Sequence, residues 1–269
     1  MDKNRLDLFL VKHQIFLSRE KALDAIKNGQ VLVDGKRQTK PAFLVNENNT
    51  ITLGEEILPY VSKGGLKLAK AIQKFHLNFE NKSVLDIGCS TGGFADCALQ
   101  YGAKFVCGID VGNGQLDERL KNNPKLNYIE NLNVKDLSAQ HIDYQTFDFV
   151  VADVSFISLT QIFAPIQIAL HQQSQLVLLI KPQFELNASS LDKNGFVKNP
   201  KHHKLAIEKI VATALQYQLF LQQIDYAPLM TYKKNIEYIS CFAFAPQKTN
   251  ICDLNLLITN AFKEKKKLK

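Results

Sequence analysis

The chain has 269 residues, of which 46% are hydrophobic and 22% are charged, and its formal net charge is +7. These values are ordinary for a globular protein of one or two domains. No apolar run approaches the roughly 18 residues that a membrane-spanning helix needs, and charges interrupt the apolar N-terminal segment, so we expect neither a membrane span nor a signal peptide. The sequence predicts a cytoplasmic protein.

Positive charge is concentrated in two stretches. One covers residues 60–82, which contain five lysines and only one acidic residue, a glutamate, and the other is the lysine-rich segment from Lys263 to Lys269. Such patches suit a polyanion such as nucleic acid, although a charge run is more often a solvated surface. No cysteine belongs to a C-x-x-C pair, so we expect buried free thiols and no metal site. The cysteines are Cys89, Cys97, Cys107, Cys241 and Cys252.

Residues 1–59 are predicted to form a small α+β unit. A helix starting near Arg5 places Leu6, Phe9 and Leu10 on one face. Ser18 is a suitable N-cap for a second helix. A glycine at the end of that helix, then a strand at 31–33 and an Asp-Gly turn, complete the pattern.

The segments RLDLFL, SREKALDAIKNGQVLVDGK and KPAFLV resemble the S4-type RNA-binding module over most of residues 3–53. The resemblance implies that the two-helix face and its basic residues grip structured RNA. A generic helical hairpin packed on a small sheet is the alternative. The candidate RNA-binding residues are Arg5, Arg19, Lys21, Lys27, Lys36, Arg37 and, just ahead of the next domain, Lys63.

Residues 83–94 have the pattern of a short apolar strand, a glycine-bearing loop and the start of a helix. A second apolar strand follows and ends at Asp110. This order is typical of a doubly wound sheet, which binds its ligand at the carboxyl ends of the strands.

Glycine spacing indicates which ligand such a loop takes. Dinucleotide sites favour G-x-G-x-x-G, whose tight turn meets a pyrophosphate. Here the wider Gly88-x-x-x-Gly92-Gly93 spacing suits S-adenosyl-L-methionine, and Asp110 can accept both ribose hydroxyls. The predicted cofactor-binding residues are Asp86, Gly88, Ser90, Gly92, Gly93, Asp110 and Asn133.

Four ionisable side chains lie at positions that should converge. Asp153 and Lys181 each end an apolar strand, and in a parallel sheet both lie at the same edge as Gly88. Lys67 lies in SKGGLKL, just ahead of the predicted domain, and Glu237 enters a late strand. Taken singly, each residue type is more often a surface ion, so only the combination beside a cofactor loop favours catalysis.

Methyl transfer to a hydroxyl requires the attacking oxygen to lose its proton. A lysine can accept that proton only if its pKa falls from about 10.4 towards neutrality, and burial and a second lysine both lower it. We expect Lys181 to act as the base and Lys67 as an electrostatic helper. Asp153 and Glu237 should orient the two ammonium groups.

The motifs SKGGLKL, LDIGCSTGGF, GIDVGNGQL, ADVSFISL, LIKPQFE and NIEYI extend over nearly the whole chain and resemble the hemolysin A (TlyA) family of rRNA 2′-O-methyltransferases. That family shares its catalytic domain with the heat-shock (FtsJ-like) rRNA methyltransferases. The resemblance implies a Lys-Asp-Lys-Glu tetrad at Lys67, Asp153, Lys181 and Glu237, and a cytidine ribose of ribosomal RNA as the target. The resemblance leads us to expect an arginine where this chain has Lys63. A lysine keeps the positive charge but cannot form the bidentate hydrogen bonds to phosphate that an arginine forms.

The predicted fold class is α/β, with a doubly wound Rossmann-like methyltransferase sheet and a small N-terminal α+β RNA-binding domain. The domains are predicted at 1–59 and 63–269, with a linker at 60–62. Ribosomal RNA or a ribosomal subunit is the expected partner, a membrane is not, and the oligomeric state is not predicted.

Two alternative functions remain open at this point. One is a membrane-active hemolysin, which would need insertion segments that do not stand out here, and the other is a non-catalytic ribosome-binding factor. A pseudouridine synthase could carry the same RNA module but would not need the cofactor loop.

Overall fold

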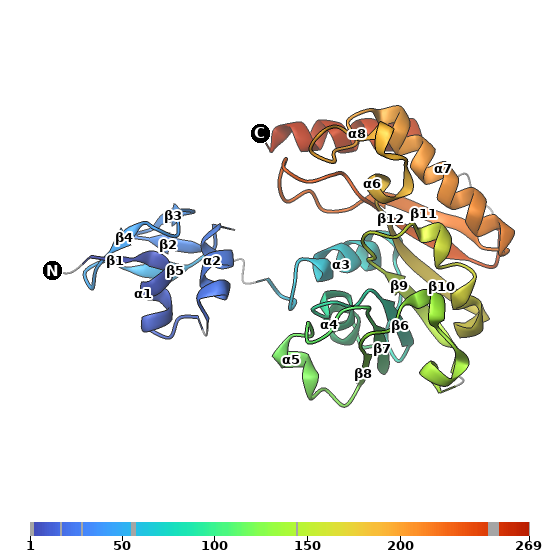
Figure 1. Cartoon of the computed structure of the whole chain (residues 1–269), viewed down its shortest axis with the longest axis horizontal. Coiled ribbons are helices and arrows are strands. Elements are labelled where there is room, and N and C mark those ends of the chain that lie inside the picture. Colours follow the sequence, from blue (N-terminus) through green and yellow to red (C-terminus); the bar gives the residue numbers. More distant parts are fainter. Residues whose placement is uncertain are drawn as a thin grey trace. The chain divides into compact units, whose positions relative to one another are not determined.

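The computed structural model describes residues 3–16, 18–27, 29–54, 58–143, 145–246 and 253–268. The chain divides into two compact units, Met1–Pro59 and Tyr60–Lys269. Both mix helices and strands, so the predicted α/β class is confirmed (Figure 1). Tyr60, which lies in the predicted linker, is buried in the second unit.

The N-terminal unit packs two helices on small antiparallel sheets. Leu6, Phe9 and Leu10 are buried together, as the helical spacing predicts, and Ser18 caps the second helix by accepting a hydrogen bond from the Lys21 amide. Strand β2 pairs with β3 and β5, and β1 pairs with β4. The elements are β1 (Asn4–Arg5), α1 (Leu6–Lys12), α2 (Arg19–Lys27), β2 (Val31–Val33), β3 (Lys36–Gln38), β4 (Leu44–Val45) and β5 (Ile51–Leu53).

The second unit is built on a seven-stranded sheet with the order β11-β12-β10-β9-β6-β7-β8. Strands β10, β9, β6, β7 and β8 are parallel, whereas β12 and β11 run antiparallel to their neighbours. The chain leaves β6 towards β8 and then returns to β9, so the strand order reverses beside β6. The strands are β6 (Ser83–Ile87), β7 (Phe105–Ile109), β8 (Leu126–Ile129), β9 (Phe147–Ala152), β10 (Leu170–Ile180), β11 (Phe220–Tyr226) and β12 (Tyr238–Ala243).

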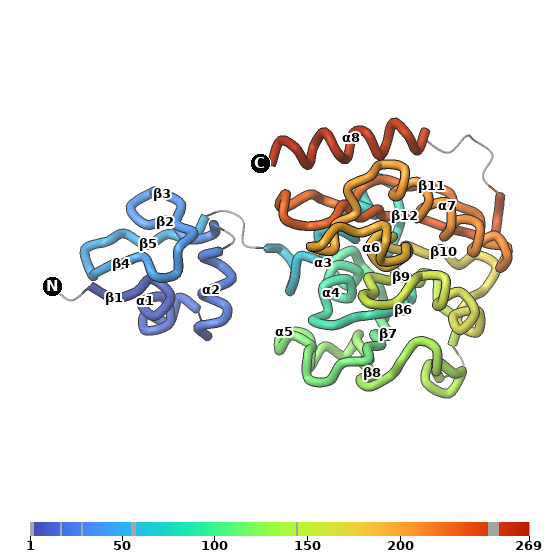
Figure 2. Tube along the Cα trace, turned by 45° about the horizontal axis from the view of Figure 1, so that its top comes forward, coloured from blue at the N-terminus to red at the C-terminus, as the bar shows by residue number. Residues whose placement is uncertain are grey.

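Helices cover both faces of this sheet, as a doubly wound fold requires. One core lies beneath α3 and α4, and the other beneath α7, α8 and the short helices that follow β9 (Figures 1 and 2). The central strands β6, β7 and β9 are almost wholly buried, because both of their faces are covered. The α-helices are α3 (Gly64–Phe75), α4 (Gly93–Gln100), α5 (Glu118–Lys121), α6 (Pro182–Glu185), α7 (Pro200–Gln216) and α8 (Leu254–Lys267).

Candidate active site

Strand direction brings the predicted reacting groups to one edge of the sheet. Asp153 follows β9 and Lys181 follows β10, and these two strands are parallel neighbours. Strand β12 is antiparallel to β10 and pairs Tyr238 with Ile180. Glu237, which precedes β12, therefore lies at the same edge as Lys181.

Lys67 reaches this edge through a glycine-mediated helix contact. It lies in the second turn of α3, whose first turn packs against the start of α4. A Cβ atom on Gly93 would lie 2.1 Å from Ser62 Oγ and 3.1 Å from the Gly65 nitrogen, and one on Gly65 would lie 2.3 Å from the Tyr60 ring. Because only glycine permits this approach, the paired glycines of SKGG and TGG fix α3 over the sheet.

The four side chains form a connected ion-pair quartet. Lys67 Nζ lies 3.0 Å from Asp153 Oδ2 and 2.9 Å from Glu237 Oε2, and Lys181 Nζ lies 2.7 Å from Asp153 Oδ1. The side chain of Lys181 is 8% exposed and the other three are between 18% and 20% exposed. The quartet is thus largely shielded but still accessible from the sheet edge.

Burial and charge act in opposite directions on these groups. Burial lowers the pKa of Lys67, but the nearby carboxylates of Asp153 and Glu237 outweigh it, so the pKa is raised. Burial raises the pKa of Asp153, but the two ammonium groups lower it by more, so this pKa lies below its ordinary value. Lys67 therefore stays protonated, in line with an electrostatic rather than a proton-accepting role.

Two further side chains that sequence reasoning missed contact the quartet, and a third joins the segments that carry it. Ser155 Oγ lies 2.8 Å from Lys181 Nζ, and Gln183 Nε2 lies 3.5 Å from Glu237 Oε1. Buried Glu185 accepts hydrogen bonds from the Ser158 hydroxyl and the Leu159 amide, which joins the segment after β10 to the segment after β9. Their positions three to five residues beyond the strand ends were the available signal.

A pair of aromatic side chains, Phe156 and Phe184, lies next to Lys181. Phe156 is 93% exposed and has φ of +63°, a left-handed conformation that is strained for a bulky residue. Its ring lies 5.3 Å from that of Phe184, and Lys181 Nζ lies 5.7 Å from the Phe184 ring centroid. An exposed, strained aromatic beside reacting groups suits stacking on a flat ligand.

The loop after β6 and the acid after β7 form a second polar cluster at the same edge. Gly88 and Ser90 both have positive φ. Asp110 Oδ2 accepts a hydrogen bond from the Ser90 amide at 2.8 Å, and Oδ1 accepts one from the Gly112 amide at 2.7 Å. Each oxygen keeps a lone pair for another donor, so the carboxylate can accept two adjacent hydroxyl groups of a ribose.

Among the remaining predicted cofactor residues, Gly92, Gly93 and Asn133 have structural roles. Gly92 and Gly93 are buried, and a Cβ on Gly92 would lie 2.4 Å from the Leu120 side chain, so packing explains both glycines. Asp86 is fully buried, and this burial raises its pKa to about 7. Asn133 caps a short helix by accepting a hydrogen bond from the Lys135 amide.

The predicted RNA-binding residues of the N-terminal unit fall into two groups. Arg5 and Arg19 both donate to the buried carboxylate of Asp7, at 2.9 Å each, while their own side chains are 44% and 54% exposed. The guanidinium groups are thereby held on the surface in fixed positions. The second group consists of exposed side chains: Lys21, Lys27, Lys36 and Arg37. The remaining predicted RNA-binding residue, Lys63, lies in the second unit, directly before α3.

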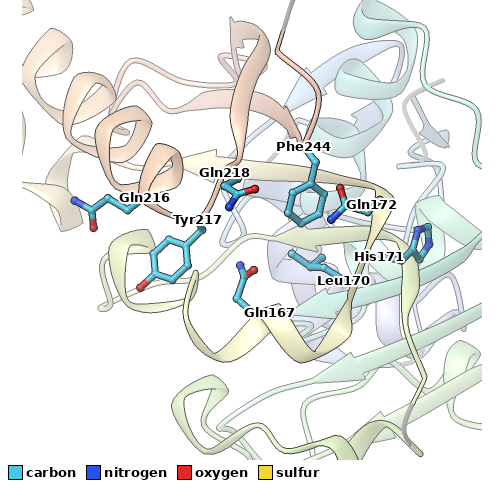
Figure 3. A pocket seen from close by; sticks show the side chains of 8 residues that line it. All are labelled: Gln167, Leu170, His171, Gln172, Gln216, Tyr217, Gln218 and Phe244. Atoms are coloured by element: carbon cyan, nitrogen blue, oxygen red, sulfur yellow. The ribbon is translucent and has the colours of Figure 1, made fainter.

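A separate cavity of about 640 Å³ lies at the opposite edge of the sheet (Figure 3). It is reached where β10 begins and α7 ends, so it is remote from Lys181 at the far end of β10. It takes no part in the quartet. Its lining residues are Gln167, Leu170, His171, Gln172, Gln216, Tyr217, Gln218 and Phe244.

The described cysteines are free and buried, as predicted: Cys89, Cys97, Cys107 and Cys241. Cys252 lies outside the described residues. In the part of the chain that the structure describes, no group of three His, Cys, Asp or Glu side chains is placed to hold a metal ion. Nor does any helix found there have the length and apolar character to cross a bilayer.

Comparison with known families matches both units. Residues 60–244 match the FtsJ-like methyltransferase family, and residues 4–51 match the S4 domain. Two curated relatives cover most of the chain. Hemolysin A of Brachyspira hyodysenteriae is 36% identical over 88% of this chain and 99% of its own length. The 16S/23S rRNA (cytidine-2′-O)-methyltransferase TlyA of Mycobacterium tuberculosis is 32% identical over 87% of both chains.

A solved structure also aligns over nearly the full length. A hemolysin from Streptococcus thermophilus is 34% identical, covers 99% of this chain and 98% of its own, and has a TM-score of 0.78. Both the relatives and the structure thus span the two units together.

Proposed function

Because the chain belongs to the FtsJ-like methyltransferase family and carries an S4 domain, we propose that it transfers a methyl group from S-adenosylmethionine to the 2′-hydroxyl of a cytidine in ribosomal RNA. The observation that carries the proposal is the contact of Lys67, Asp153, Lys181 and Glu237 at the sheet edge that also bears the glycine loop. A ribosomal substrate implies a place in the cytoplasm.

The polar cluster after β6 and β7 has the donor and acceptor set that the cofactor needs. Asp110 would hold the ribose hydroxyls, and the backbone around Gly88 and Ser90 would approach the amino-acid end. When bound, S-adenosylmethionine supplies an electrophilic methyl group on a sulfonium centre. The protein's task is therefore to position the hydroxyl and to remove its proton.

Lys181 is the better placed of the two lysines to take that proton. Its ammonium contacts one carboxylate and the neutral Ser155 hydroxyl, whereas the ammonium of Lys67 contacts two carboxylates. The ammonium of Lys181 is therefore held by fewer opposite charges than that of Lys67. As a neutral amine it accepts the 2′-hydroxyl proton and becomes an ammonium beside Asp153, while Lys67 stabilises the developing oxyanion.

The aromatic pair offers a stacking surface for the base of the target nucleoside. Unstacked bases of RNA loops and bulges are commonly bound by stacking on aromatic side chains. Phe156 and Phe184 would replace the lost stacking, which is worth about 1–3 kcal/mol per base. Fixed Arg5 and Arg19 on the S4 unit would grip neighbouring RNA.

The test uses ribosomal subunits isolated from cells that lack this protein and radiolabelled S-adenosylmethionine. After digestion to nucleosides, label should appear in 2′-O-methylcytidine, and the modified position should resist alkaline cleavage. Label on a base, or none on either subunit, would refute the proposal. A non-catalytic ribosome-binding factor would bind the subunits without transferring label, and a lytic protein would release haemoglobin from red cells.

A further inference from the structure

The catalytic unit carries a second concentration of basic residues, distinct from the S4 unit. This concentration, which we call the basic rim, has three parts. They are residues 191–201 (a loop that runs into the first residues of α7, called loop 191–201), the loop 228–236 between β11 and β12, and the last turns of α8. Loop 228–236 and the C-terminal end of α8 lie at the same end of the unit (Figures 1 and 2). The lysines of the rim are Lys193, Lys198, Lys201, Lys233, Lys234, Lys263, Lys265, Lys266 and Lys267.

Specific contacts hold the two loops of the rim together. Asn235 Nδ2 donates to the Gly195 carbonyl at 2.9 Å, and its Oδ1 accepts from the Val197 amide at 2.9 Å. The buried imidazole of His203 donates from Nε2 to the Val197 carbonyl at 2.8 Å. Loop 191–201 is therefore fixed both to loop 228–236 and to the start of α7.

The C-terminal helix is fixed to the same loop. Lys265 Nζ lies 5.2 Å from the ring centroid of Phe196, and the ring of Phe262 packs edge-on against His203 at 5.0 Å. These contacts place the lysine-rich turns of α8 beside loop 191–201. Three segments far apart in the sequence thus form one surface.

The charge of this surface is almost entirely positive. Its acidic residues are Asp192, which pairs with Lys198 and accepts two backbone amides, and Glu264, which pairs with Lys267. Loop 228–236 has no acid but exposes Met230 and Tyr232. Lysines combined with exposed apolar and aromatic groups are typical of a nucleic-acid contact.

The rim leads directly into the active site. Glu237 directly follows loop 228–236, and a hydrogen bond from the Ala227 amide to the Glu237 carbonyl closes the base of this loop. A strand of RNA whose target ribose lies over Lys181 would therefore pass close to Lys233 and Lys234. The charge there is complementary to phosphate.

We propose that the basic rim binds the phosphate backbone of the substrate RNA next to the target nucleotide. This inference rests on the proposed function, since it takes RNA as the substrate of the neighbouring quartet. The S4 unit then anchors one part of the RNA, while the rim aligns the segment that enters the active site. Phosphate contacts of this kind position a substrate without reading its sequence.

The experiment compares two double variants of equal charge change in the full-length protein. Lys233→Gln/Lys234→Gln removes two charges from the rim, and Lys104→Gln/Lys125→Gln removes two exposed charges ahead of β7 and β8, at the opposite sheet edge. Affinity for ribosomal RNA is measured by filter binding over a range of salt concentrations. We expect the rim variant to lose on the order of ten-fold in affinity at low salt, and to reduce the salt slope by about 1.5.

A second rim variant, Lys263→Gln/Lys266→Gln, should behave like the first if the α8 turns belong to the same surface. Equal losses in rim and control variants, or unchanged affinity and slope in the rim variants, would overturn the inference. So would a rim that binds anionic phosphatidylglycerol vesicles but contributes nothing to RNA affinity. Methylation by the wild-type protein is measured in parallel: if it succeeds and the rim variants are unaffected, only this inference fails, whereas absence of methylation refutes the proposed function.

Discussion

Replacing each active-site lysine by arginine separates the base from its helper. Arginine keeps a positive charge but does not lose its proton near neutral pH. In Lys181→Arg the ion pair with Asp153 can persist while the proton acceptor is lost. The single-turnover rate of methyl transfer should therefore fall by a factor of about 10² to 10⁴, which corresponds to an increase of about 3–5 kcal/mol in the activation barrier. In Lys67→Arg the charge between Asp153 and Glu237 is kept, and we expect a loss of no more than about ten-fold.

The assay is single-turnover methylation of ribosomal subunits as a function of pH, with affinity for S-adenosylmethionine and the melting temperature as controls. Lys181→Arg should lower the methylation rate at every pH at which the wild-type enzyme is active, because arginine does not lose its proton in that range. Both variants add similar bulk at largely buried positions, so each controls for the packing change in the other. A Lys181→Arg enzyme within ten-fold of wild type, or a Lys67→Arg enzyme that is the more damaged, would reverse the assignment.

Three further predictions follow from the geometry. Asp110→Asn should weaken S-adenosylmethionine binding about 10- to 100-fold, because a charge-assisted bond contributes about 1.5–3 kcal/mol, and calorimetry should show this while RNA affinity is unchanged. Gly93→Ala should lower the unfolding free energy by about 1–3 kcal/mol, since its Cβ would lie 2.1 Å from Ser62 Oγ, and adding Ser62→Gly should recover part of the melting temperature. Burial lowers the pKa of His203 from 6.5 to about 4, so the unfolded chain binds the proton first and stability should fall by about 3 kcal/mol as pH drops from 6.5 to 4. Denaturant unfolding across that range should show a slope that His203→Gln lacks; equal slopes would refute the linkage.

The sequence by itself determined the features that depend on local pattern and chain direction. Helical spacing was enough to predict the buried face of Leu6, Phe9 and Leu10. Apolar strands predicted that Asp153 and Lys181 share a sheet edge, because parallel strands all end on the same side. The strand, glycine loop and distal acid likewise predicted where Asp110 would lie.

Only the tertiary structure decided the contacts between distant segments. Lys67 precedes Asp153 by 86 residues and meets it because glycines let α3 pack closely on α4. The raised pKa of Lys67 follows from two carboxylates whose distances no sequence pattern contains. Buried Asp7 fixes Arg5 and Arg19 of the S4 unit in the same way. Electrostatic and packing energies fall steeply with separation, so they are set by three-dimensional geometry rather than by the order of residues.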